Sequence, residues 1–121
     1  MTKPKILLAE DDFTMVSLLK TLLKMEGFDV FSLHGDDNVP EAIRQEKPDV
    51  LLMDVHLLNQ SGLDILDEIR QAQDISETRV VMSSGANVKE ECMSHGANGF
   101  LLKPYMPDEL IALLKQAIKP D

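Results

Sequence analysis

Five short apolar runs alternate along the chain with five segments whose apolar residues recur at helical spacing. Most of these runs are apolar at successive positions, which is typical of strands that are buried on both faces of a parallel sheet. Parallel neighbours need crossover connections, and the intervening helical segments supply them. The alternation therefore predicts an open, doubly wound α/β sheet with helices on both faces. Its strands are expected at residues 5–9, 29–33, 49–54, 79–84 and 99–103.

Residues between the runs indicate where helices begin and end. Asn38 and Ser61 precede helical patterns as N-caps, and Glu41 stands at the third helical position after Asn38. Asn87 is the predicted cap of a fourth helix, which ends before Gly96. Only about eight residues are available to this helix, fewer than the roughly 12 at which an isolated helix is marginally stable. We therefore expect the fourth helix to depend on tertiary contacts.

The composition limits the partners of such a domain. The 121 residues include 12 Lys and Arg against 21 Asp and Glu, which gives a formal net charge of −9. An acidic surface repels the phosphates of nucleic acids and anionic lipids, so direct binding to nucleic acid or membrane is not expected. No apolar run reaches the roughly 20 residues that cross a bilayer, and the lone Cys92 has no internal disulfide partner. We expect one cytoplasmic domain that covers residues 1–121.

Charged and polar residues gather where the predicted strands end. The first strand runs into Asp11 and Asp12, and the third ends at Asp54. The fourth strand ends at Ser84 and the fifth at Lys103. Ligand sites of open parallel sheets lie beyond the carboxyl ends of the strands. These five side chains are therefore predicted to meet in one pocket.

Three carboxylates in one pocket need compensating charge. Two of them about 4 Å apart repel by roughly 4 kcal/mol at an effective dielectric constant near 20, and Lys103 balances only one. Oxygen ligands with open water positions suit Mg²⁺, which also bridges to phosphoryl groups. The predicted chemistry is phosphoryl transfer with Asp54 as nucleophile, and with Ser84 and Lys103 contacting phosphoryl oxygens. Taken alone, Asp11 or Asp12 has a second role open to it, as N-cap of the first helix.

These residues make the sequence resemble the receiver domains of two-component response regulators. The resemblance covers nearly the whole chain and implies a flavodoxin-like (βα)5 fold with strand order 2-1-3-4-5. The motifs that carry it follow the family's order: the acidic pair Asp11-Asp12 before Phe13, Asp54, Gly62, Ser84-Gly85, Gly96-Ala97 and Phe100-Leu101-Leu102-Lys103-Pro104.

The resemblance also implies how a metal ion and a phosphoryl group would be held. Asp54 would be the phosphoacceptor, Asp12 would bind Mg²⁺ directly, and Asp11 would bind it mainly through water. The backbone carbonyl of His56 would complete the protein ligands. A role for the His56 ring, in phosphate relay or metal binding, is an open alternative.

Other residues would transmit the signal. By the resemblance, Ser84 and Phe100 form a switch pair, although the adjacent Ser83 leaves the strand register open. Lys103 would contact the phosphoryl group, and the peptide between Lys103 and Pro104 would be cis.

The sequence departs from the family pattern at two places. The usual Met-Pro after the phosphoacceptor is Leu57-Leu58 here, which removes a proline that stiffens the metal-binding loop. The stretch between Ser84 and Lys103 is also about one helical turn short, so the fourth helix is short.

The resemblance implies a signalling switch rather than an enzyme. The domain would take a phosphoryl group from a phosphohistidine on a histidine kinase or histidine phosphotransfer protein. It would then change its contacts with a downstream protein target. We expect a monomer whose output is protein contact, because no effector domain follows the receiver pattern.

Two other functions use related sheets. A Mg²⁺-dependent phosphohydrolase of the haloacid dehalogenase type also forms an aspartyl phosphate, but its nucleophile follows the first strand and a cap domain covers it. A flavin-binding electron carrier has a phosphate-binding loop where this chain has acids. Both alternatives are therefore less favoured than the receiver.

Overall fold

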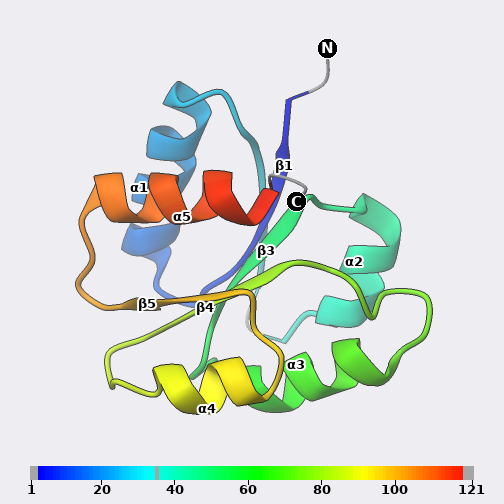
Figure 1. Cartoon of the computed structure of the whole chain (residues 1–121). Helices are drawn as coiled ribbons and strands as arrows, with labels where there is room; N and C mark the ends of the chain where they lie inside the picture. Colours follow the sequence, from blue (N-terminus) through cyan, green and yellow to red (C-terminus); the bar gives the residue numbers. More distant parts are fainter. Residues whose placement is uncertain (1–2, 35, 119–121) are drawn as a thin grey trace.

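The computed structural model describes residues 3–34 and 36–118, which form a five-stranded parallel sheet with helices on both faces (Figure 1). The strand order is β2-β1-β3-β4-β5, which confirms the predicted fold class. The elements in chain order are β1 (Lys5–Ala9), α1 (Phe13–Met25), β2 (Asp29–Leu33), α2 (Val39–Glu46), β3 (Val50–Asp54), α3 (Gly62–Gln71), β4 (Val80–Ser84), α4 (Lys89–Ser94), β5 (Gly99–Leu102) and α5 (Pro107–Ile118).

The sheet divides the apolar core into two layers because successive strand residues point to opposite faces. One layer, here the α2–α4 core, joins strand residues to side chains from α2, α3 and α4; it includes Leu7, Leu51, Met53, Met82, Ile43, Leu66, Ile69 and Cys92. The other, the α1–α5 core, includes Ile6, Leu8, Leu52, Val81, Leu19, Leu23, Leu110 and Leu114. The central strands are thus covered on both sides, as their continuous apolar runs predict. No helix within these described residues is long and apolar enough to span a membrane.

Two predicted helix starts are confirmed by their capping hydrogen bonds. The Asn38 side chain accepts the backbone N–H of Glu41 at 3.0 Å and begins α2. The Ser61 hydroxyl accepts the N–H of Asp64 at 3.4 Å and begins α3. In each case a side-chain oxygen satisfies an N–H that the first helical turn leaves unpaired.

The start of α4 differs from the prediction. The capping position is Val88, which offers no side-chain hydrogen bond, although the Asn87 side chain one residue earlier accepts the Lys89 N–H at 3.5 Å. The Val88 N–H donates to the Ala86 carbonyl at 2.9 Å, and this three-residue turn starts the helix later than expected. The helix has six residues and ends before Gly96, whose φ of 101° is open to glycine at little cost. The C-terminal end of α4 thus lies where the sequence predicts it, but the N-terminal end does not.

Candidate functional site

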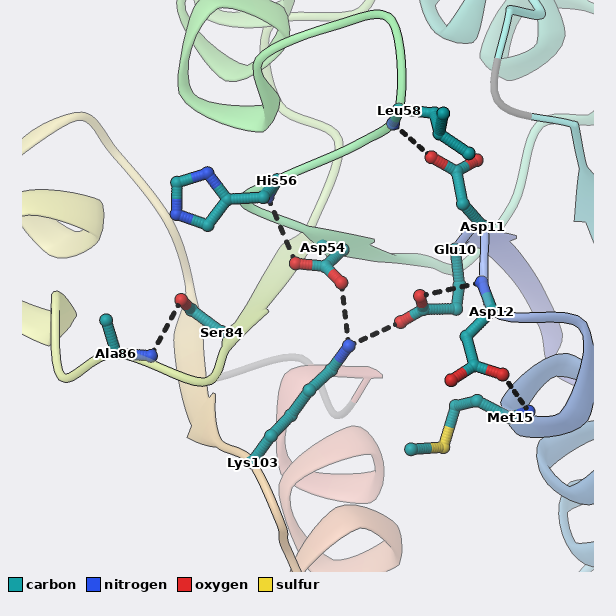
Figure 2. A network of polar contacts seen from close by, with 10 residues as sticks. All are labelled: Glu10, Asp11, Asp12, Met15, Asp54, His56, Leu58, Ser84, Ala86 and Lys103. Atoms are coloured by element: carbon teal, nitrogen blue, oxygen red, sulfur yellow. Dashed lines mark hydrogen bonds and ion pairs between the residues drawn. The ribbon is translucent and has the colours of Figure 1, made fainter.

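Polar side chains from four strand ends face one another at the carboxyl edge of the sheet (Figure 2). The parallel register decides which residues lie level with each other. β1 and β3 are paired up to Ala9 and Met53. The next residue in each strand direction is an acid, Glu10 after β1 and Asp54 at the end of β3. The two acids therefore lie side by side.

Asp54 is buried, with 9% of its surface exposed. Its carboxylate oxygens have different donors: the backbone N–H of His56 donates to Oδ1 at 3.0 Å, and Lys103 Nζ donates to Oδ2 at 2.7 Å. A buried carboxylate without partners is costly, and charge-assisted hydrogen bonds of this kind offset the loss of water. The carboxylate is thus oriented at both oxygens and lies beside a cationic group.

Lys103 bridges two carboxylates. Its Nζ lies 2.7 Å from Asp54 Oδ2 and 2.7 Å from Glu10 Oε2. Burial lowers the pKa of this ammonium, but the hydrogen bonds and charges of Asp54 and Glu10 outweigh burial, so the pKa lies above its ordinary value. The backbone N–H of Lys103 donates to the Ser84 carbonyl at 2.8 Å and holds the residue beside β4. A positive charge is therefore fixed next to Asp54.

Glu10 contacts Lys103 at this site, and the sequence reasoning did not include it. It is the first acid after the apolar run of β1, and the prediction placed the two acids after it in the site instead. The signal that identifies it is the register, because Glu10 lies one residue beyond the last paired residue of β1, as Asp54 does on β3.

Asp12 takes the second role that the sequence left open. Its carboxylate accepts the backbone N–H of Met15 at 3.1 Å and caps α1. Its own backbone N–H donates to Glu10 Oε1 at 3.2 Å. Glu10, which the predicted cluster did not include, thus contacts Lys103 together with Asp54, while Asp12 caps α1.

Asp11 reaches across to the loop between β3 and α3. One of its carboxylate oxygens accepts the backbone N–H of Leu58. In Figure 2 the Asp11 carboxylate points toward this loop, and the Leu58 side chain lies apart from Asp54. Asp11 thus belongs to the same edge as Asp54 but is held by a different donor.

The arrangement bears directly on metal binding. Within residues 3–34 and 36–118, no three His, Cys, Asp or Glu side chains are placed so that they could hold one metal ion. The three predicted carboxylates, Asp11, Asp12 and Asp54, each accept a hydrogen bond from the protein. The side chains at this edge still suit a hard cation as ligands, since Glu10, Asp11 and Asp54 offer only carboxylate oxygens. A cation would have to replace some of these internal donors.

Ser84 and its neighbour occupy different roles at the end of β4. Ser84 is fully buried, and its hydroxyl accepts the N–H of Ala86 at 3.1 Å. Ser83 is level with Asp54 in the β3–β4 pairing, and its carbonyl accepts the N–H of Val55 at 2.9 Å. The Ser84 hydroxyl therefore lies at the start of the segment that leads into α4 (Figure 2).

The other predicted residues are placed as follows. Phe100 is half-buried on β5, level with Met82, and packs against the α2–α4 core. The His56 side chain is exposed, while its backbone N–H contacts Asp54. The peptide bond between Lys103 and Pro104 is cis.

Known proteins resemble this chain over nearly all of its length. The sequence model described as the response regulator receiver domain matches residues 6–115. The transcriptional regulatory protein CpxR of Klebsiella pneumoniae is 36% identical over 118 residues, which are 95% of this chain and 49% of that protein. The transcriptional regulatory protein KdpE of Staphylococcus aureus is 32% identical, over 92% of this chain and 48% of that protein. The chain thus spans about half the length of these relatives.

Solved structures share the fold as well. A response regulator from Chloroflexus aurantiacus superposes with a TM-score of 0.88 at 26% identity, covering 97% of this chain and 98% of the other. The receiver domain of a Pseudomonas aeruginosa sensor histidine kinase, which has a magnesium ion coordinated in its active site cleft, gives a TM-score of 0.79 at 25% identity. That match covers 97% of this chain and 98% of the other.

Proposed function

This chain belongs to the family of response regulator receiver domains, and on that premise we propose that Asp54 accepts a phosphoryl group from a phosphohistidine. The donor is a histidine kinase or a histidine phosphotransfer protein, and the result is a changed contact with a downstream protein. The observation that carries the proposal is the buried Asp54 carboxylate at the end of β3, with Lys103 Nζ 2.7 Å away.

The residues support a simple transfer. A carboxylate oxygen of Asp54 attacks phosphorus, and the bond from phosphorus to the histidine nitrogen breaks. The imidazole, which carries a proton on its other ring nitrogen, leaves as a neutral group with that electron pair. Lys103 follows the phosphoryl group because its ammonium is already fixed beside Asp54, and it offsets negative charge on the phosphoryl oxygens. The backbone N–H of His56 keeps the carboxylate in one orientation. No step requires a proton from another side chain.

Mg²⁺ would be held by Asp54 and Asp11, with Glu10 beside them and the backbone carbonyl of His56 as a further oxygen. The ion supplies charge neutralisation for the entering phosphoryl group. Asp12 is left out of this proposal because its carboxylate caps α1. The proposal therefore uses Glu10 and Asp11 in place of Asp11 and Asp12. Glu10 contacts Lys103, whereas the Asp12 carboxylate accepts the Met15 N–H.

The switch would begin at Ser84. Its hydroxyl accepts the Ala86 N–H, so a phosphoryl oxygen on Asp54 offers the hydroxyl a new acceptor and draws the entry to α4 toward the site. Phe100 packs on the same face as α4 and would move with it. A downstream protein would then meet an altered surface of α4, β5 and α5.

The place of the nucleophile in the sheet favours a switch over a phosphohydrolase. In the hydrolase alternative the nucleophile follows the first strand, whereas the buried carboxylate that is oriented at both oxygens here is Asp54, at the end of β3. The acidic surface of these 121 residues, with a formal charge of −9, favours output through a protein rather than through DNA. The CpxR and KdpE proteins are transcriptional regulators of about twice this length, so any DNA contact in such proteins would belong to another part of the chain.

Phosphorylation by a small donor tests the proposal. With acetyl phosphate and Mg²⁺, intact mass should show one added phosphoryl group that alkali removes, as expected of an acyl phosphate. Asp54→Asn should show none. Asp11→Asn should lose most of the labelling, whereas Asp12→Asn, the matched control for a neighbouring acid, should retain it. A phosphoryl group on Asp54→Asn would overturn the assignment of the nucleophile, and loss of labelling in Asp12→Asn as well as in Asp11→Asn would favour Asp11 and Asp12 as the metal-binding acids.

A further inference from the structure

One hydrogen bond at the site comes from a residue whose side chain plays no part in it. The backbone N–H of Leu58 donates to the Asp11 carboxylate across 47 positions of sequence. The Leu58 side chain is 78% exposed, so only its main chain contacts the site. The pattern that this sequence resembles has proline here, and proline has no N–H to donate. The contact is therefore a consequence of this chain's own residue.

The loop that presents this N–H is tightly closed. The Gly62 N–H donates to the Val55 carbonyl at 2.7 Å, the Leu57 N–H donates to the Gln60 carbonyl at 3.2 Å, and His56 and Ser61 form a bridge. These bonds span the whole segment from β3 to α3 without a proline. The loop thus holds the Leu58 N–H at a fixed position relative to Asp54.

Gly62 adds to this closure through its lack of a side chain. A Cβ at this position would lie 2.3 Å from the Asp54 carbonyl oxygen and 2.9 Å from Val55 Cα. Only glycine lets α3 begin this close to the backbone of β3. The position of the Leu58 N–H is therefore set by backbone packing and does not depend on a mobile side chain.

We propose that the Leu58 N–H competes with Mg²⁺ for the Asp11 carboxylate and so weakens metal binding to the unphosphorylated domain. The inference rests on the proposed function, because it assumes that Asp11 is a metal ligand. The donor holds the Asp11 carboxylate toward the loop, and the described acidic side chains are not gathered closely enough for one ion. An ion that joins Asp11 to Asp54 therefore requires the Asp11 carboxylate, which this N–H holds at Oδ2, to turn away from the loop. Leu58 is a positioning residue whose main chain sets the affinity of the site.

The bond is of the stronger kind, because a hydrogen bond to a charged acceptor contributes more than one between neutral groups. Removing the donor while keeping both carboxylates should tighten Mg²⁺ binding about tenfold, which corresponds to about 1.4 kcal/mol. The effect should be on the dissociation constant of the ion itself, measured without any phosphoryl donor.

The experiment is a calorimetric Mg²⁺ titration of the whole 121-residue chain and two variants. Leu58→Pro removes the N–H, and Leu58→Ala is the matched control that shortens the side chain but keeps the N–H. We expect Leu58→Pro to bind about tenfold more tightly than wild type, and Leu58→Ala to match wild type. Equal affinity in all three proteins, or weaker binding by Leu58→Pro, would overturn the inference.

Proline also stiffens the loop, so a second variant separates the two effects. Replacement of Leu58 by its α-hydroxy analogue, which turns the amide into an ester, removes the N–H without restricting the backbone. This protein should show the same tightening, and an unchanged affinity would assign the proline effect to stiffness and overturn the inference. Failure of every variant to bind Mg²⁺ would overturn the metal site of the proposed function together with it.

Discussion

α3 and α4 lie side by side on the same face of the sheet, yet they are held in very different ways (Figure 1). α3 has ten residues, a side-chain cap at Ser61 and four buried residues. α4 has six residues, no side-chain cap and one buried residue, Cys92. A short helix contributes little stability of its own and depends on packing. The difference indicates that α3 belongs to the fixed frame of the site, while α4 is the element that a change at the site can shift.

The attachment of α4 is also uneven along its length. At its C-terminal end, His95 Nδ1 lies 2.7 Å from Asp67 Oδ1, and Arg70 Nε donates to the Gly96 carbonyl at 2.9 Å. At its N-terminal end, the chain arrives from Ser84 with no side-chain cap. Both polar contacts therefore connect the C-terminal end of α4 to α3. We expect α4 to open from the end nearest the site.

Hydrogen exchange should show the largest effect. Amides of Leu66 and Ile69 in α3 should exchange about 1,000-fold more slowly than those of Cys92 and Met93 in α4, equivalent to about 4 kcal/mol. The reason is that α4 can open locally, whereas α3 is released only with the core. Rates corrected for sequence effects, measured by NMR, test this. Equal protection of the two helices would remove the distinction between a fixed and a movable helix.

Two glycines at the starts of these helices test the same contrast through stability. Gly62→Ala puts a Cβ within 2.3 Å of the Asp54 carbonyl oxygen, and we expect a loss of about 3 kcal/mol in the free energy of unfolding. Gly85→Ala, between β4 and α4, is the matched control, because nothing lies within 4 Å of its Cβ. Its cost should be below about 0.5 kcal/mol. Urea unfolding measures both, and similar losses would mean that the entry to α4 is packed as tightly as that of α3.

The fold could be predicted from the sequence because the relevant signals are local. Apolar runs identify the strands, and Asn38 and Ser61 cap helices through their own side chains. Asn87 has the same chemistry, and its side chain accepts the Lys89 N–H at 3.5 Å, but the turn between Ala86 and Val88 moves the capping position to Val88. A cap depends on backbone geometry as well as on residue type, and a short helix offers too little periodicity to fix its first residue.

The site could be predicted only in part, because it depends on register between strands. The sequence places Asp54 and Lys103 at the ends of the third and fifth strands, which flank β4, and the two side chains are in contact. Three consecutive acids follow β1, and a shift of one residue decides which of them lies level with Asp54. The Leu58 contact could not be predicted at all, since a main-chain donor appears in no side-chain pattern.

Lys103 allows the coupling between the site and α4 to be tested. We expect a beryllofluoride mimic of the phosphoryl group to change the exchange rates of α4 amides about tenfold in wild type, and less than about twofold in Lys103→Ala, because the bond from the ammonium to the new oxygens is lost. Lys115→Ala is the control, since Lys115 is an exposed lysine on α5 that pairs with Glu26 at 3.9 Å. A wild-type response in Lys103→Ala would show that the signal reaches α4 without this lysine.

The smallest expected effect concerns the tether between His95 and Asp67. The hydrogen bond to Asp67, with the charges of Asp67, Glu91 and Asp64, raises the pKa of His95 above its ordinary value. The folded state therefore favours the charged ring. The stabilisation is complete below the unfolded pKa of about 6.5 and is lost as pH rises through the raised folded pKa. Protection of α4 amides, corrected for intrinsic exchange, should therefore fall as pH rises above about 6.5 in wild type. The change should be a few-fold at most, because both partners are largely exposed.

Asp67→Asn and His95→Asn should each remove this pH dependence while leaving α3 protection unchanged. A pH dependence that persists in His95→Asn would mean that another group controls the C-terminal end of α4.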